Sequence, residues 1–205
     1  MKHKITDIQS LLEKFDTSGP RYTSYPTAPQ FHTDVTRNDW NRAFQKSNQS
    51  NTNISLYLHI PFCKQACNYC DFHFSTSMKM KADFLQAITQ EIELRKDVFA
   101  NEFISSVYFG GGTPSLLSKQ DLDSIFEKLY KSFTIDADAE ITLEANPDDL
   151  TFEKIQQLKD STVNRLSIGV QSFRDEDLKY MNRAHTNIEA LNSIKMAQDA
   201  GFQNI

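Results

Sequence analysis

Three cysteines are the residues of this sequence whose type and spacing most clearly could do chemistry. They are the only cysteines among its 205 residues, and all lie within Cys63-Lys64-Gln65-Ala66-Cys67-Asn68-Tyr69-Cys70. Disulfides between such close neighbours would be strained, and an odd number leaves one thiol over. Thiolates are the ligands of iron–sulfur clusters, most of which use four cysteines. The spacing C-x3-C-x2-C therefore predicts a [4Fe–4S] cluster with one iron left open to a small molecule.

Two other interpretations of the cysteines stay open at this point. A zinc ion would need a fourth ligand, which His59 or His73 could supply. Three inert buried thiols are the purely structural alternative. The position of the motif favours a functional site, because it follows an apolar–polar alternation over residues 54–60. That places it at the carboxyl end of an expected strand, where β/α barrels carry their active sites. Aromatic residues around the cysteines could exclude water: Phe62, Tyr69, Phe72 and Phe74.

Further polar or side-chain-free positions follow the other expected strands. Gly110, Gly111 and Gly112 come directly after the second strand, where missing side chains let a ligand approach the backbone closely. Glu144 ends the third strand and Gln171 lies just beyond the fourth, and both side chains suit ribose hydroxyls or an amino group. A flexible turn and solvated strand ends are the plainer alternatives. Arg183, further along, could bind a carboxylate.

Strands and helices are expected to alternate from residue 54 onward. The apolar patterns predict strands at 54–60, 104–109, 139–144 and 164–169. They predict helices at 80–99, after Ser118, after Thr151, at 175–181 and at 187–200, with Gly201 as a stop. Residues 202–205 resemble the opening of a fifth strand. This order predicts right-handed β-α-β units and an α/β fold with a parallel sheet.

The domain organisation follows from the same patterns. Residues 1–50 are predicted to form an extended N-terminal arm, with a short helix at 7–15 and an irregular segment at 18–29 that holds three prolines and a glycine. Residues 51–205 are the predicted core domain. A whole β/α barrel takes about 250 residues, so the roughly 150 residues after the arm predict a truncated barrel of four strand–helix units, its last strand having an unpaired edge.

Composition excludes several classes of protein. The net charge is -5 and the isoelectric point is about 5.5, so there is no basic surplus to neutralise the phosphates of a nucleic acid. No signal-peptide stretch follows Met1, and no window approaches the ~20 apolar residues of a transmembrane helix. A cytoplasmic protein is therefore expected.

Four motifs together resemble one known family. They are residues 56–63 (LYLHIPFC) with the cysteine spacing, 110–114 (GGGTP), 144–147 (EANP) and 164–173 (NRLSIGVQSF). In these the chain resembles the oxygen-independent coproporphyrinogen III oxidase family of radical S-adenosylmethionine (SAM) proteins. The resemblance covers nearly the whole chain.

The resemblance implies a radical SAM β/α barrel, a [4Fe–4S] cluster on Cys63, Cys67 and Cys70, and bound SAM. It implies an electron donor such as a flavodoxin or ferredoxin, and cleavage of SAM to a 5′-deoxyadenosyl radical. Matching motifs assign Tyr57, Gly111 and Glu144 to the SAM on the cluster. A second SAM, which the oxidase also binds, would contact Tyr69, Gly112, Thr113, Gln171 and Arg183.

The resemblance divides between two branches of the family. Residues 18–28 (SGPRYTSYPTA) resemble the oxidase, which converts two propionates of coproporphyrinogen III to vinyl groups. The oxidase has C-x-C at the end of its cluster motif, whereas here Phe72 stands in place of the fourth cysteine. Most of residues 54–205 are closer to the heme chaperone branch, which carries heme as cargo and lacks the decarboxylase activity. The sequence thus leans slightly to the chaperone, with the oxidase and an inactive cluster-binding fragment as alternatives.

Overall fold

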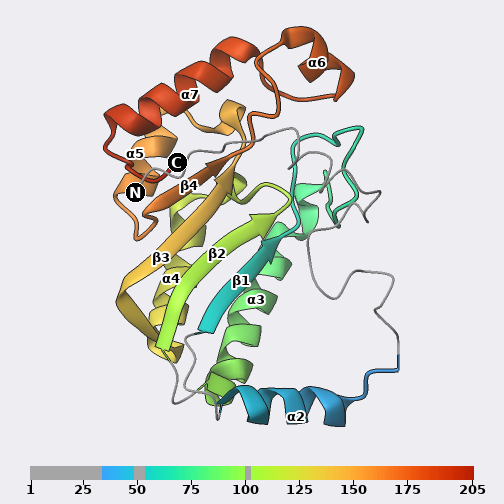
Figure 1. Cartoon of the computed structure of the whole chain (residues 1–205), viewed down its shortest axis with the longest axis vertical. Helices are drawn as coiled ribbons and strands as arrows, with labels where there is room; N and C mark the ends of the chain where they lie inside the picture. Colours follow the sequence, from blue (N-terminus) through green and yellow to red (C-terminus); the bar gives the residue numbers. More distant parts are fainter. Residues whose placement is uncertain (1–33, 49–53, 100–102) are drawn as a thin grey trace, which may run out of the picture. The chain divides into compact units, whose positions relative to one another are not determined.

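The computed structural model describes residues 34–48, 54–99 and 103–205. The chain separates into two compact units, Met1–Phe44 and Gln45–Ile205. The helix and irregular segment predicted within residues 7–29 lie outside the described residues. The site belongs to the second unit, which Figure 1 shows as a sheet with helices.

Helix α2 (Arg37–Asn48) is an element that the patterns of the predicted arm did not indicate. Its start is set by a reciprocal pair of hydrogen bonds. The Thr36 N–H donates to Asp39 Oδ2 over 2.9 Å, and the Asp39 N–H donates to Thr36 Oγ1 over 3.3 Å. Such a pair satisfies backbone donors that the first helical turn leaves free. The range predicted for the extended arm therefore includes a helix.

Four parallel strands form one sheet in the order β1-β2-β3-β4, which is also their order along the chain. Sequential parallel strands joined by helices are the arrangement of a β/α barrel. The predicted α/β class and its parallel sheet are thus confirmed, as part of a barrel. The strands are β1 Ile54–Ile60, β2 Phe103–Gly111, β3 Thr134–Ala145 and β4 Arg165–Ile168.

Helices connect these strands, and α3 and α4 lie together behind the sheet in the view of Figure 1. Ser118 and Asp121 form the predicted capping box of α4, and the Thr151 side chain caps α5 as predicted. The predicted helix 80–99 is α-helical only in its middle, with 3-10 turns at both ends. The helices are α3 Lys81–Arg95, α4 Lys119–Ser132, α5 Phe152–Lys159, α6 Asp175–Tyr180 and α7 Asn187–Asp199.

The core lies between the sheet and these helices. Each fully buried aliphatic or aromatic side chain contributes about 1.5–3 kcal/mol relative to exposure, so this layer fixes where the strand ends lie. Its largest members with no more than 2% exposure come from strands, helices and the turns after β2 and β3: Ile60, Ile104, Phe109, Leu143, Leu166, Leu122, Ile125, Leu129, Ile155, Leu158, Leu117 and Leu150.

Strand β3 differs most from its prediction, since it begins at Thr134 and not at residue 139. Its first half carries Asp136 and Asp138, which have low strand propensity. Pairing with β2 resumes on either side of them, because Ile135 lies opposite Ile104 and Glu140 lies opposite Ser106, and the two aspartates fall in the register shift between these pairs.

The end of the described chain turns back to the sheet as predicted. Gly201 has φ +89°, and the Phe202 N–H donates to the Ala197 carbonyl over 3.1 Å, so α7 ends in a left-handed glycine stop. Asn204 then forms one parallel bridge with Arg165 of β4.

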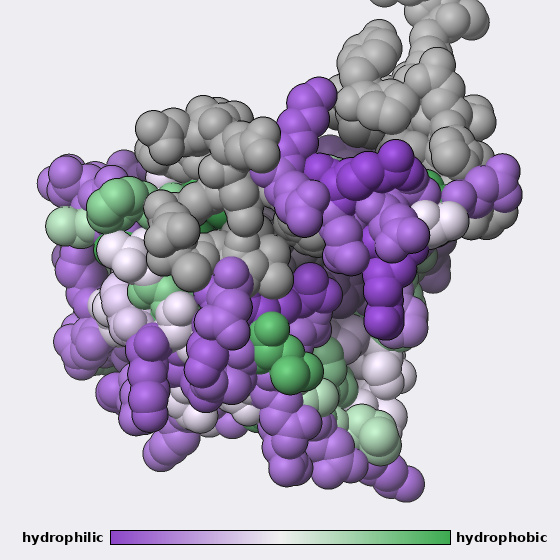
Figure 2. Space-filling model, turned by 90° about the horizontal axis from the view of Figure 1, so that it is seen from below, coloured by the Kyte–Doolittle hydropathy of each residue, from purple (hydrophilic) through white to green (hydrophobic). Residues whose placement is uncertain are grey.

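Figure 2 shows the unit from below, at the amino ends of the strands. This visible face is mostly hydrophilic with a few apolar side chains between. Within the described residues no helix has both the length and the apolar character that a membrane crossing requires.

Candidate functional site

A cavity of about 230 Å³ opens at the carboxyl ends of the strands. The three cysteines, the glycine run and residues that follow β3 and β4 all line it. Of the residues that the sequence assigned to the cluster or to SAM, the structure therefore brings together all except Tyr57; Gly110, the first glycine of the run, does not line the cavity either. The residues brought together are Cys63, Cys67, Cys70, Tyr69, Gly111, Gly112, Thr113, Glu144, Gln171 and Arg183.

The loop that carries the cysteines is held at its neck and at its tip. At the neck, the Cys63 N–H donates to the Ser75 carbonyl over 3.0 Å. At the tip, Asn68 donates from its backbone N–H to the Met181 carbonyl over 3.0 Å, and from its side chain to the Tyr180 carbonyl over 2.7 Å. The loop therefore has a defined course between β1 and the segment that follows α6.

The cysteines suit a bound cation. All three are free thiols; Cys63 is buried, while Cys67 and Cys70 are half-buried. Burial raises the pKa of the Cys63 thiol, and the negative charges of the neighbouring thiolates raise this pKa further. Thiolates that repel each other in this way gain from a cation that binds all three. The donor set of three sulfur atoms around one cavity fits an iron–sulfur cluster.

His59, one of the two histidines considered as a fourth zinc ligand, is not free to bind a metal ion in this structure. Both ring nitrogens of this histidine are engaged, Nδ1 with the Tyr57 hydroxyl at 3.2 Å and Nε2 with the His73 carbonyl at 3.0 Å. A zinc ion would also need its ligands to converge within about 2.3 Å of one point. Across residues 34–48, 54–99 and 103–205, no three His, Cys, Asp or Glu side chains are grouped as ligands of a single ion.

Gly111, the last residue of β2, and Gly112, which follows it, both lie close to other parts of the protein. A Cβ at Gly111, whose φ is +112°, would lie 2.6 Å from the His59 ring. A Cβ at Gly112 would lie 2.8 Å from the Phe62 carbonyl oxygen and 3.0 Å from Cys63 Sγ. From the sequence, these glycines were expected to let a ligand approach the backbone. The structure adds that the cysteine loop itself needs this space.

Glu144, at the end of β3, is oriented by two donors. Tyr108 donates its hydroxyl to Oε1 over 2.7 Å, and the Gly111 N–H donates to Oε2 over 3.2 Å. Tyr57, on β1, stacks on Tyr108 with ring centroids 5.9 Å apart. Burial raises the pKa of Tyr57, and the charge of Glu144 adds to this rise. Tyr57 is thus linked to the cavity through Tyr108, and its contact with SAM remains a prediction.

Arg183 reaches from the segment after α6 to the cysteine loop. Its Nη1 lies 3.3 Å from Cys67 Sγ and 3.5 Å from the Tyr69 hydroxyl, and its Nη2 donates to the Gly169 carbonyl over 2.7 Å. Burial raises the pKa of Tyr69, and the positive charge of Arg183 opposes this rise. The carboxylate expected for Arg183 stays a prediction, and the structure adds a contact between this cation and a cysteine sulfur.

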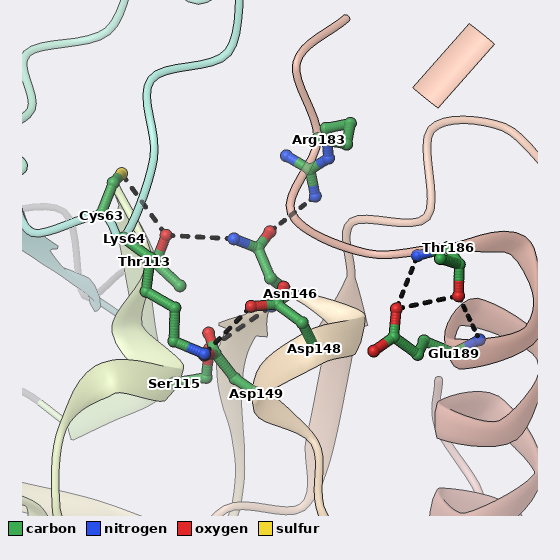
Figure 3. A network of polar contacts seen from close by, with 10 residues as sticks. All are labelled: Cys63, Lys64, Thr113, Ser115, Asn146, Asp148, Asp149, Arg183, Thr186 and Glu189. Carbon is green, nitrogen blue, oxygen red and sulfur yellow. Dashed lines mark hydrogen bonds and ion pairs between the residues drawn. The ribbon is translucent and has the colours of Figure 1, made fainter. Parts of the chain in front are cut away.

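A chain of hydrogen bonds joins Cys63, Thr113, Asn146 and Arg183, which all line the cavity (Figure 3). The Thr113 hydroxyl donates to Cys63 Sγ over 3.4 Å, and Asn146 donates from Nδ2 to Thr113 Oγ1 over 3.3 Å. Arg183 Nη2 in turn donates to Asn146 Oδ1 over 2.7 Å. Asn146 belongs to the motif at 144–147, for which no separate role of this residue was predicted, although its place directly after β3 could have indicated one.

Gln171 has a backbone conformation that residues other than glycine rarely adopt. Its φ is +64°, in the left-handed region, and Gln171 lines the cavity just after β4. Such strain costs about 1–3 kcal/mol and often accompanies functional sites. Of the aromatic residues expected around the cysteines, Tyr69, Phe72 and Phe74 line the cavity. Phe62 instead packs edge-on against Phe84 in the core.

An ion-paired network anchors the cysteine loop to the turn after β3 (Figure 3). Lys64 pairs with Asp148 at 3.0 Å and also with Asp149, whose side chain is only 3% exposed. Asp149 accepts a further hydrogen bond from the Ser115 hydroxyl over 2.7 Å. These residues could not be predicted as a network, because charged side chains so far apart in sequence give no local pattern.

Replacing Asp149 with alanine should lower the free energy of unfolding by about 2 kcal/mol, since it removes the partner of a buried Ser115 hydroxyl. The ion pair adds little, because Lys64 is 48% exposed and solvent screens it. Urea unfolding followed by circular dichroism measures the change. Asp138→Ala, an exposed carboxylate of β3, is the matched control and should change stability by less than about 0.5 kcal/mol. Equal losses in both variants would contradict a structural role for the network.

Comparisons with known proteins agree with this geometry. The family model of the radical SAM superfamily matches residues 57–205. An oxygen-independent coproporphyrinogen III oxidase from Escherichia coli (strain K12) is 36% identical over 195 residues, which are 94% of this chain and 42% of that protein. A heme chaperone HemW from Lactococcus lactis is 39% identical over 151 residues, 74% of this chain and 39% of that protein.

A solved structure also resembles the chain. The structure of coproporphyrinogen III oxidase (HemN) from Escherichia coli, described as a radical SAM enzyme, superimposes with a TM-score of 0.81 at 33% identity, over 95% of this chain and 43% of that one. The chain thus spans less than half the length of each of these relatives.

Proposed function

Since the chain belongs to the radical SAM superfamily, we propose that Cys63, Cys67 and Cys70 hold a [4Fe–4S] cluster and that the adjoining cavity binds SAM. One observation carries the proposal: the three thiols line the same cavity as the residues that follow β2, β3 and β4. When bound, the cluster supplies the electron that cleaves the sulfonium of SAM.

The residues of the chain would bind and orient SAM. We assign Tyr57, Gly111 and Glu144 to the SAM on the cluster, because the Glu144 carboxylate is already oriented by Tyr108 and Gly111. A carboxylate suits the amino group or the ribose hydroxyls of SAM. Tyr69, Gly112, Thr113, Gln171 and Arg183 are proposed for a second SAM. Tyr69 and Phe72, with Phe74, would restrict water at the mouth of the cavity.

Besides SAM, the chain is proposed to bind a tetrapyrrole, because the relatives named above are a coproporphyrinogen oxidase and a heme chaperone. We favour heme binding over oxidation of coproporphyrinogen III, since Phe72, which is 70% exposed at the cavity, replaces the extra cysteine of the oxidase. The oxidase remains the second candidate, supported by an alignment that extends over 94% of this chain. Reduction would require an external electron donor, for which a flavodoxin or ferredoxin is proposed.

A heme titration separates the two activities. We expect heme to give a saturable change in absorbance with the reconstituted chain, and no conversion of coproporphyrinogen III when SAM and reductant are added. Cys63→Ala is the control for the assay, because it removes one cluster ligand and leaves Tyr69, Phe72 and Phe74 in place. Protoporphyrinogen or a monovinyl intermediate above this control would establish the oxidase instead. If the chain holds its cluster but neither binds heme nor converts coproporphyrinogen III, the inactive fragment is favoured.

A further inference from the structure

Two hydrogen-bond donors point at the sulfur atoms of the cysteine loop. The Thr113 hydroxyl lies 3.4 Å from Cys63 Sγ, and Arg183 Nη1 lies 3.3 Å from Cys67 Sγ. Donors to the ligand sulfurs of an iron–sulfur cluster are one of the means by which a protein sets the reduction potential. They stabilise the more negative, reduced state more than the oxidised state.

Asn146 contacts both donors and orients each of them. Its Nδ2 donates to Thr113 Oγ1 over 3.3 Å, so the Thr113 hydroxyl accepts there and directs its own proton to Cys63. Its Oδ1 accepts from Arg183 Nη2 over 2.7 Å, which leaves Nη1 free to face Cys67. The orientation of the amide is unambiguous, because a guanidinium can only donate. Figure 3 shows Asn146 between the two.

The position of Asn146 is itself fixed. It follows the last residue of β3, and its backbone N–H donates to Ser115 Oγ over 3.4 Å. Gly169, directly after the neighbouring strand β4, leaves room for the arrangement, since a Cβ there would lie 3.3 Å from Asn146 Oδ1 and 3.4 Å from Arg183 Nη2. The amide is therefore held between the segments that follow β2, β4 and α6.

We propose that Asn146 is a positioning residue for cluster reduction, because it aims the Thr113 hydroxyl at Cys63 and the Arg183 guanidinium at Cys67, and so raises the reduction potential of the cluster. The inference rests on the cluster proposed above. It goes beyond that proposal, which gives Asn146 no part, and it assigns Thr113 and Arg183 a role toward the cluster in addition to SAM.

The test is a reductive titration of the reconstituted 205-residue chain with dithionite and mediators, followed by electron paramagnetic resonance. At a fixed ambient potential, Asn146→Ala should lower the ratio of reduced to oxidised cluster about tenfold, which for one electron corresponds to a potential lower by 59 mV. Thr113→Val should lower the ratio by a smaller factor. Thr113→Ser keeps the hydroxyl, so its ratio should stay close to that of the unsubstituted chain.

A double variant tests whether Asn146 acts through Thr113. In the Asn146→Ala background, adding Thr113→Val should change the ratio little, because the hydroxyl has already lost its orientation. Additive changes, or an unchanged ratio in Asn146→Ala, would overturn the inference, even if that variant unfolds more easily. If Asn146→Ala does not fold, Asn146→Leu, which keeps a side chain of similar size without the amide, decides by the same measure. Absence of iron and sulfide from the unsubstituted chain would overturn the proposed cluster, and the inference with it.

Discussion

Replacing any one of Cys63, Cys67 or Cys70 with alanine is expected to abolish cluster binding. After anaerobic reconstitution, the unsubstituted chain should hold about four iron and four sulfide, with an absorption shoulder that bleaches on reduction. A cluster with two remaining protein ligands has two exposed irons, and no further cysteine exists in the sequence to replace the lost one. Iron and sulfide analysis of each variant measures the effect.

Asp71→Asn is the matched control, because Asp71 is an exposed residue beside Cys70 in the same loop. It should reconstitute like the unsubstituted chain. Iron and sulfide retained at the full ratio in any cysteine variant would show that this cysteine is no ligand. Stoichiometric zinc in the purified chain, with no uptake of iron, would support the alternative metal.

Replacing Gly111 with alanine should lower the free energy of unfolding by roughly 3 kcal/mol, much more than the same change at Gly201. Both glycines have a positive φ, +112° and +89°, so both substitutions strain the backbone by about 1–2 kcal/mol. Only at Gly111 does the new Cβ also meet the His59 ring at 2.6 Å; at Gly201 the nearest atom lies at 3.5 Å. The difference between the two variants isolates the clash.

Urea unfolding of both variants gives this difference directly. The His59 ring cannot move without losing its hydrogen bonds to Tyr57 and His73. Removing the ring should therefore recover part of the lost free energy of unfolding, which the double variant His59→Ala with Gly111→Ala measures. Equal destabilisation at Gly111 and Gly201 would mean that the strand end relaxes around the new methyl group.

Much of the fold could be predicted because its signals are local. The apolar alternation over residues 54–60 predicted β1 with both its bounds, and Ser118 with Asp121 predicted the start of α4. The parallel arrangement followed from the order of strands and helices. Strand ends are where a barrel carries its site, so residues after each strand could be named, and all of those assigned to the cluster or to SAM except Tyr57 line one cavity.

The rest depended on contacts between distant residues. Asn146 acquires its role only from the two side chains beside it, and Asp149 is buried only because Ser115 and Lys64 reach it. The first half of β3 is acidic, and only its first two residues, Thr134 and Ile135, pair with β2 before the register shift. None of these partners is visible in a window of sequence around the residue itself.

The anchoring of the cysteine loop has a consequence for the order in which the protein is made. Asn68 bonds to Tyr180, 112 residues away, and Gln65 bonds to Asn182, 117 residues away. Contacts of such large separation form late, because a long loop must close before they stabilise anything. On the ribosome, β1 and the three cysteines therefore emerge well before the segment that holds the tip of their loop. The thiols would remain without this support until residue 182 has left the exit tunnel, so metal incorporation that needs the finished cavity would follow synthesis of α6.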